Sequence, residues 1–192
     1  MLSRMKAAQR PSILQPEFHQ AEALVTLRTA EEAMKSPEAA DRAIEAAENQ
    51  IRTTLSVTPT DSLMWLMMYS VETARNGFDA GNIVYLDQSY VSGPNDGWVA
   101  LRRNRLALAA LPMLSERTQS LVISEFTTIV DSDFIDEAAL NLTTVGWVHR
   151  ERLTASLEKA DISSRQSLAR RLSVDGVKLR IPGIETGDRP WR

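Results

Sequence analysis

The sequence contains no cysteine and only two histidines in 192 residues. Without cysteine, the chain has no disulfide, no thiolate nucleophile and no thiolate metal ligand. The two histidines, His19 and His149, lie far apart in the sequence, and neither has a second histidine or a carboxylate four residues later. A zinc site needs several nitrogen, sulfur or carboxylate ligands held close together. We therefore predict no metal site.

Glycine-rich catalytic motifs are also missing from the sequence. The eight glycines form neither the G-x-x-x-x-G-K-[ST] phosphate loop, nor the G-x-G-x-x-G dinucleotide fingerprint, nor the G-x-S-x-G nucleophile elbow. Carboxylates do occur close together, at Glu31-Glu32 and at Asp131 with Asp133. A solvated helix surface or a helix start accounts for both pairs. We predict no catalytic residue, no cofactor and a non-enzymatic protein.

The chain lacks an apolar run long enough to cross a bilayer. The apolar stretch Leu63–Val71 has about nine residues, whereas a membrane-spanning helix needs about 20. Residues 1–16 include basic residues and two prolines, but they lack the apolar core of a signal peptide. We predict a cytoplasmic protein with no integral membrane segment. A missing upstream signal or anchor would instead place it in the periplasm or at a membrane.

The charge balance does not favour a nucleic-acid partner. The net charge is -3, whereas nucleic-acid-binding domains usually carry a basic surplus. Charged residues make up 24% and hydrophobic residues 43%, which is an ordinary mixture for a soluble globular domain. The length suits one domain with a sizeable core. We predict a loose lead-in over 1–16, a single helical domain over 17–176 and an extended, irregular tail over 177–192.

The apolar stretch Leu63–Val71 predicts the central helix of this domain. It is apolar at almost every position, so neighbouring elements must cover it from all sides. Asp61 offers an N-cap oxygen at the start of the helix, and Asn76-Gly77 provides a C-terminal stop. Within this helix we expect Trp65 to be buried.

Helical periodicity and capping residues recur along the rest of the chain. Apolar positions spaced by three and four residues predict about eight helices with short connections and no convincing pair of strands. Short connections favour antiparallel neighbours, so we predict an all-α fold of helical hairpins, arranged as a bundle or a short solenoid. The predicted helices cover 17–35, 37–57, 62–76, 79–91, 97–111, a segment from Ser115, a segment capped by Asp133 and divided at Gly146 before about Lys159, and a segment from Ser163 to Asp175.

Residues 37–96 resemble a tetratricopeptide repeat (TPR), whose period is about 34 residues. Pro59 and Pro94 lie 35 residues apart, and each is predicted to end a helical hairpin. The positions that match the repeat pattern are Trp65, Met68, Gly81 and Tyr85, whereas Tyr69 and Glu72 depart from it. In this pattern a small residue such as Gly81 lets two helices cross closely. The resemblance implies a TPR-like short solenoid with grooves between helix pairs; an unrelated helical bundle is the alternative.

A second resemblance concerns the segment Ser89–Leu111 and the ending of the chain, where Ile181-Pro182-Gly183 is followed by Pro190-Trp191. Together these segments are similar to small bacterial repeat-like proteins found beside genes for exopolysaccharide synthesis and export. The resemblance implies a supporting role in envelope polysaccharide assembly. It supplies no catalytic residues.

Three arginines, Arg102, Arg103 and Arg105, lie on the predicted helix 97–111. Successive helical residues are about 100° apart, so these side chains fan around more than half of the helix circumference. At least one of them must therefore approach buried surface, where a guanidinium needs a carboxylate, a set of carbonyls or a ligand. Two interpretations stay open: an internal ion pair with solvated arginines around it, or a concave site for an anion or a carboxylate-bearing peptide.

Taken together, these patterns predict a helical interaction scaffold that binds a protein partner or a peptide segment. In this hypothesis Arg102, Arg103 and Arg105 bind anionic groups, and Trp98 serves as an aromatic anchor. Two alternatives remain open: an enzyme acting on a sugar or a phosphorylated compound, and a structural subunit that forms a homodimer. An enzyme would need a deep pocket with convergent titratable groups.

Overall fold

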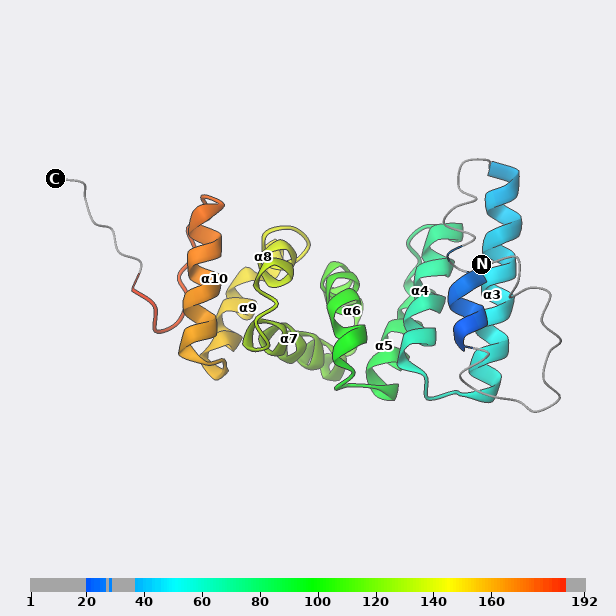
Figure 1. The fold of residues 1–192 in the computed structure, drawn as a ribbon, viewed down its shortest axis with the longest axis horizontal. Helices are drawn as coiled ribbons and strands as arrows, with labels where there is room; N and C mark the ends of the chain where they lie inside the picture. The colour runs from blue at the N-terminus through cyan, green and yellow to red at the C-terminus, as the bar shows by residue number, and fades with distance from the viewer. Residues whose placement is uncertain (1–19, 27, 29–36, 186–192) are drawn as a thin grey trace. The chain divides into compact units, whose positions relative to one another are not determined.

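All regular secondary structure in the described part of the chain is helical. The computed structural model describes residues 20–26, 28 and 37–185, and no strand occurs among them (Figure 1). The all-α prediction is therefore confirmed. A helix over 20–26 lies within the predicted helix 17–35, but the lead-in over 1–16 falls outside the described residues.

The chain divides into two compact units, one ending at Pro94 and the other beginning at Asn95. We predicted a single helical domain over 17–176, so the structure differs from the sequence-based expectation. The division falls in the turn Gly93-Pro94-Asn95-Asp96, where proline restricts its own φ and disfavours helical backbone at the preceding residue. Each unit is described separately below.

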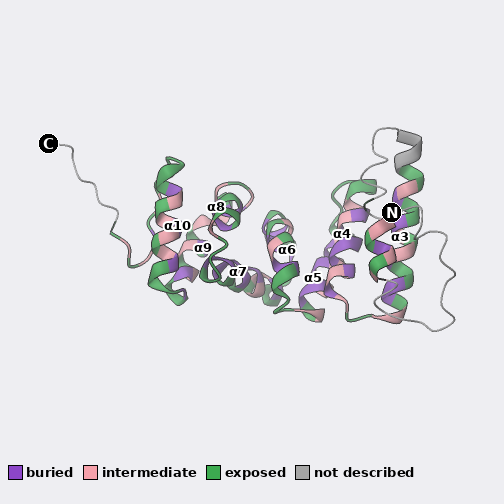
Figure 2. Cartoon of the chain, in the orientation of Figure 1, coloured by how far each residue is buried: buried purple, intermediate pink, exposed green. Residues whose placement is uncertain are grey.

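The first unit contains α3 (Pro37–Val57), α4 (Ser62–Asn76), a 3-10 turn η1 (Ala80–Asn82) and α5 (Ile83–Ser92). Helix α4 packs against both α3 and α5, and buried residues run along it (Figure 2). The side chains of Met64, Leu66, Met67 and Met68 are at most 1% exposed. The prediction that Leu63–Val71 forms a covered central helix is confirmed for this unit.

Both ends of α4 follow the predicted capping chemistry. The Asp61 carboxylate accepts a hydrogen bond from the Met64 amide at 3.0 Å, which satisfies one of the amides left unpaired at a helix start. Gly77 ends the helix with a φ of 74°, a region that glycine enters without the steric cost of a Cβ. Local sequence therefore determines where this helix begins and ends.

The prediction that Trp65 is buried is wrong, because the residue is only half-buried. Its ring stacks on Tyr85 of α5, with centroids 6.2 Å apart and planes inclined by 18°. Its indole N–H donates to the Pro59 carbonyl oxygen at 2.8 Å. An indole carries one polar group that needs a partner, and this position supplies both an aromatic face and a carbonyl.

The second unit contains α6 (Gly97–Ala109), η2 (Leu111–Met113), α7 (Glu116–Asp131), α8 (Ile135–Thr143), η3 (Trp147–His149), α9 (Arg150–Ser156), η4 (Leu157–Lys159) and α10 (Ile162–Val174). Helix α7 packs against α6, α8, α9 and α10, so it is the central helix of this unit. Its residues Val122, Phe126 and Val130 are fully buried.

Two predicted caps of the second unit are wrong. Asp133 lies before α8 with a φ of 65° and does not cap it; Phe134 occupies the N-cap position. Helix α10 is capped by Asp161, which accepts from the Ser163 amide at 2.8 Å, and not by Ser163 itself. In both cases the predicted cap is a polar residue that lies one or two positions away from the residue at the N-cap.

Gly146 divides the chain between α8 and α9 as predicted, and close packing explains why a glycine occupies this position. A Cβ at Gly146 would lie 2.8 Å from the Asn141 carbonyl oxygen and 2.8 Å from Leu153 Cδ1. The backbone of the α8–α9 connection can approach these atoms only because the side chain is absent.

The chain after α10 follows the unit's surface without regular structure over the described residues 177–185. Ile181 is 1% exposed, so it anchors this stretch in the core of the unit. Arg165 of α10 donates to the Pro182 carbonyl oxygen at 2.7 Å. The remaining part of the predicted tail lies outside the described residues.

We expect the far-UV circular dichroism spectrum to be dominated by helix, because every described element is helical. The measurement is a spectrum of the purified chain at neutral pH, deconvoluted for helix and strand. A strand content above roughly a fifth, which is the average for soluble domains, would contradict the all-α fold.

Candidate partner-binding surface on α6

Helix α6 presents an exposed stripe that combines one tryptophan with two arginines. Trp98, Arg102 and Arg105 follow one another at spacings of four and three residues, which places them on one side of an α-helix. The Trp98 side chain is 82% exposed, and Arg102 and Arg105 are both exposed. We call these three residues the α6 stripe.

The opposite side of α6 packs into the second unit and contains the third predicted arginine. Arg103 is 0% exposed. Its guanidinium donates from Nη2 to Glu125 Oε1 at 2.6 Å and from Nε to the same oxygen at 3.1 Å. The expectation that at least one arginine approaches buried surface is confirmed. Placing Arg103 on a ligand-binding surface was wrong, because its head is enclosed with Glu125.

The Arg103–Glu125 ion pair belongs to a buried polar network that joins three helices. Asn104 of α6 donates to the Val122 carbonyl oxygen of α7 at 3.0 Å, and its amide also lies 3.4 Å from Glu125 Oε2. Asn141 of α8 donates to Asn104 Oδ1 at 3.3 Å. Buried polar groups are costly unless they are paired, so this network holds α6, α7 and α8 in one relative arrangement.

Sequence reasoning missed Glu125 and Asn141 as partners of the arginine helix. Glu125 follows Arg103 by 22 positions and Asn141 follows Asn104 by 37. A signal for Glu125 was available, since it is a charged residue between the apolar positions Val122 and Phe126 on the inner side of α7. A carboxylate at such a position requires a cation nearby.

The α6 stripe has the chemistry of a recognition surface for anionic groups. A guanidinium binds carboxylates and phosphates through paired N–H donors, and its charge persists at any physiological pH. An exposed indole adds a large apolar face and one N–H donor. Arg105 forms no ion pair with another residue in the described part of the chain. The stripe can therefore bind a segment that combines carboxylates with an apolar group.

The residues that resemble the tetratricopeptide pattern lie in the first unit. Tyr85 packs on Trp65 as an interlocking aromatic pair. Gly81 does not mark a close helix crossing, because it is exposed and a Cβ there would approach only the Asp79 carboxylate, at 3.0 Å. The predicted role of Gly81 is therefore wrong.

The described residues contain no candidate metal site and no candidate membrane-spanning helix. No three His, Asp or Glu side chains in 20–26, 28 and 37–185 gather closely enough to hold a metal ion. Burial, and then the charge of Arg152, lower the pKa of His149. His19 lies outside the described residues.

None of the described helices has the length and apolar character needed to span a bilayer.

Comparison with known proteins found no relative of this chain. No protein-family model, no curated protein and no solved structure matches it.

Proposed function

We propose that this protein is a non-enzymatic helical interaction scaffold that binds an acidic segment of a partner protein through the α6 stripe. The observation that carries the proposal is the 82% exposure of Trp98 on the same helix side as Arg102 and Arg105. A tryptophan that lies in water gains stability when a partner covers it. Two cations beside it favour a partner that brings carboxylates.

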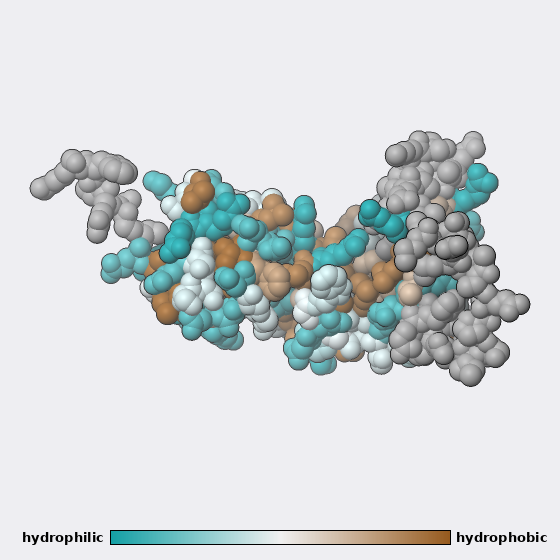
Figure 3. Space-filling model, in the orientation of Figure 1, coloured by the Kyte–Doolittle hydropathy of each residue, from teal (hydrophilic) through white to brown (hydrophobic). Residues whose placement is uncertain are grey.

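The residue types of the α6 stripe support a protein partner. Tryptophan and arginine are enriched among the few interface residues that contribute most of the binding energy. The second unit is a mosaic of hydrophilic and hydrophobic residues on the face drawn in Figure 3. Such a mixed surface suits an interface in which one aromatic anchor is surrounded by polar contacts.

The two family resemblances of the sequence indicate the cellular process in which the partner would take part. Helical-repeat proteins of the tetratricopeptide type present helix surfaces to peptide segments. The segment Ser89–Leu111, which includes the α6 stripe, together with the ending of the chain, resembles small bacterial proteins found beside exopolysaccharide-synthesis genes. We propose that the partner belongs to the machinery of envelope or exopolysaccharide assembly.

Co-purification from the native cell tests the proposed function. We expect the wild-type chain to capture one or a few recurrent proteins, and the triple variant Trp98→Ser, Arg102→Gln, Arg105→Gln to capture roughly 30-fold less, because losing one strong anchor alone costs about 2 kcal/mol. Raising the salt from about 0.1 M to 1 M should also release the partner, since the screening length falls from about 10 Å to 3 Å.

A matched control changes equally exposed residues away from the stripe. The double variant Val148→Ser, Arg117→Gln removes an 81% exposed apolar side chain from η3 and an exposed arginine from α7. It should capture the same proteins as the wild type. Equal capture by the triple variant would refute the proposal. If the chain instead captured only itself, and sedimented as a dimer that the triple variant abolished, the structural-homodimer alternative would replace it.

A further inference from the structure

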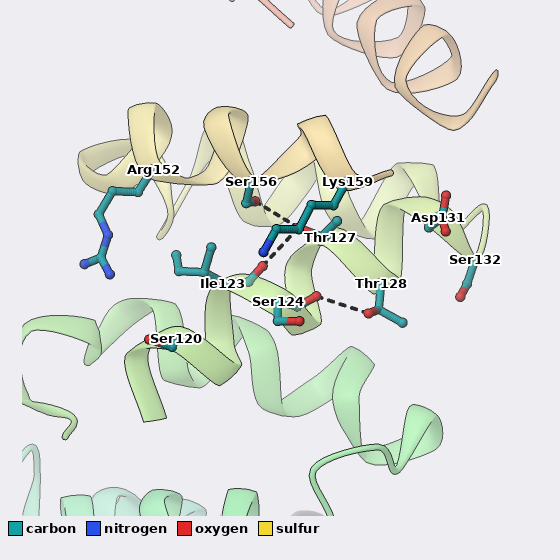
Figure 4. Close-up of a pocket in the computed structure, with 10 residues that line it drawn as sticks. All are labelled: Ser120, Ile123, Ser124, Thr127, Thr128, Asp131, Ser132, Arg152, Ser156 and Lys159. Carbon is teal, nitrogen blue, oxygen red and sulfur yellow. Dashed lines mark hydrogen bonds between the residues drawn. The ribbon is translucent and has the colours of Figure 1, made fainter. Parts of the chain in front are cut away.

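A polar groove lies on the second unit between α7 and the α9–η4 segment (Figure 4). Its volume is about 440 Å³, which falls within the range of pockets that hold small ligands. Helix α7 contributes Ser120, Ser124, Thr127 and Thr128, and the facing segment contributes Arg152 and Lys159. None of these residues belongs to the α6 stripe.

On the α7 floor of this groove, the hydroxyls of Ser120, Ser124 and Thr128 lie beside the apolar side chain of Ile123. Thr128 donates to the Ser124 carbonyl oxygen at 3.1 Å, and Ser120 donates to the Glu116 carbonyl oxygen at 3.0 Å. Their hydroxyl hydrogens are thus directed at the helix backbone, whereas each hydroxyl oxygen keeps capacity to accept a hydrogen bond. The floor therefore offers acceptors to a ligand that carries hydroxyl donors.

Two cations stand at the wall opposite these hydroxyls. Arg152 and Lys159 are seven residues apart on the α9–η4 segment, and Ser156 lies between them. Figure 4 shows Lys159 extending toward α7, with Arg152 at the other end of the groove. Arg152 donates to the neutral amide oxygen of Gln119 at 3.1 Å, so this contact leaves its charge uncompensated. Lys159 forms no ion pair with another residue of the described chain.

The carboxylate that lines the groove is already engaged. Asp131 Oδ1 accepts a hydrogen bond from the Asp161 amide at 2.7 Å, at the start of α10. The groove lining therefore carries two positive charges and one negative charge, and the negative charge is directed toward a backbone amide. Across the groove, Thr127 donates to Ser156 Oγ at 2.9 Å, which ties the two walls together.

We propose that this groove binds a small anionic sugar, in which a phosphate or carboxylate contacts Lys159, and the sugar hydroxyls contact Arg152 and the Ser and Thr oxygens of α7. A compact ammonium such as Lys159 binds phosphate or carboxylate oxygens strongly. The hydroxyl floor favours a polyol over an apolar anion. This binding site is independent of the α6 stripe, so either proposal can fail without the other.

Chemical-shift mapping on the uniformly 15N-labelled full chain tests the site. The probes are glucose 6-phosphate, glucuronate, glucose and inorganic phosphate, each titrated to about 10 mM, a range that detects millimolar dissociation constants. We expect glucose 6-phosphate or glucuronate to shift the amides of 120–132 and 152–159 in a saturable manner. The tighter of these two ligands identifies the anionic group as phosphate or carboxylate.

Variants locate the binding in the groove. We expect Lys159→Gln to weaken binding about tenfold, because a charge-assisted hydrogen bond is lost. Ser124→Leu fills the floor and should abolish binding. The matched controls are Lys178→Gln, which removes an exposed lysine elsewhere in the unit, and Ala155→Leu, which adds the same bulk on an exposed position of α9. Both should bind as the wild type does.

Four outcomes would overturn this proposal. The first is the absence of saturable shifts with any probe, and the second is equal affinity for glucose and glucose 6-phosphate. The third is an affinity for inorganic phosphate as high as that for the anionic sugars. The fourth is unchanged affinity in both the Lys159→Gln and the Ser124→Leu variants. If Lys159→Gln does not fold, Lys159→Met replaces it, with the same expected loss. Capture of a protein partner through the α6 stripe is unaffected by any of these results.

Discussion

Replacement of Arg103 by Gln is expected to lower the free energy of unfolding by about 3–5 kcal/mol, because it leaves Glu125 buried without its cation. The Arg103 side chain is 0% exposed and that of Glu125 is 5% exposed, so water cannot replace the lost guanidinium. The two N–H donors now shared with Glu125 Oε1 would disappear together. Urea denaturation followed by circular dichroism measures the change.

Two further variants separate the buried ion pair from a general effect of losing arginine. Arg105→Gln removes an exposed arginine from the same helix and should change the free energy of unfolding by less than about 0.5 kcal/mol. The double variant Arg103→Met, Glu125→Leu removes both charges and should recover most of the stability lost by Arg103→Gln. A loss below about 1 kcal/mol for Arg103→Gln would show that Glu125 reaches solvent or another cation.

Replacement of Phe126 by Ala is expected to cost about 3–5 kcal/mol, the usual loss for a large aromatic side chain in a packed core. Phe126 is fully buried on α7, the helix that contacts α6, α8, α9 and α10. Truncation would leave a cavity that these neighbours can close only by moving together. The measurement is again urea denaturation, with the midpoint and the slope compared with those of the wild type.

The matched control for Phe126 is the same substitution at Phe134, which is 43% exposed beside α8. Phe134→Ala should cost about 1 kcal/mol or less, since much of this ring is already in contact with water. Equal losses at the two positions would mean that α7 is not the centre of the second unit.

Local signals were sufficient to predict most of the helices. Helix α3 begins at Pro37 as predicted and ends near the predicted position, and the Asp61 cap and the Gly77 stop of α4 lie where the sequence placed them. Caps and stops depend on a few neighbouring residues, so they can be read without knowledge of the fold. The cap of α8 was predicted wrongly. Asp133, the residue before the N-cap Phe134, adopts a left-handed backbone conformation and does not cap the helix.

Packing partners were harder to predict. The apolar stretch Leu63–Val71 was expected to organise the whole chain, yet α4 is central only to the unit that ends at Pro94. The second centre, α7, is less conspicuous in the sequence because serines and threonines alternate with its apolar residues. Trp65 was expected in the core because it lies in this apolar stretch, but its ring is only half-buried and its N–H donates to the Pro59 carbonyl oxygen.

The sequence by itself determined the all-α class, the start and end of α4 and the fact that the three arginines of α6 cannot all face solvent. Only the tertiary structure decided that Arg103 turns inward to Glu125, while Arg102 and Arg105 remain on the exposed side with Trp98. The physical reason is that helical geometry depends on residues three and four positions apart, whereas burial of a charge depends on where the opposite charge lies in space. That position is set by how α6 and α7 pack, and no local pattern records it.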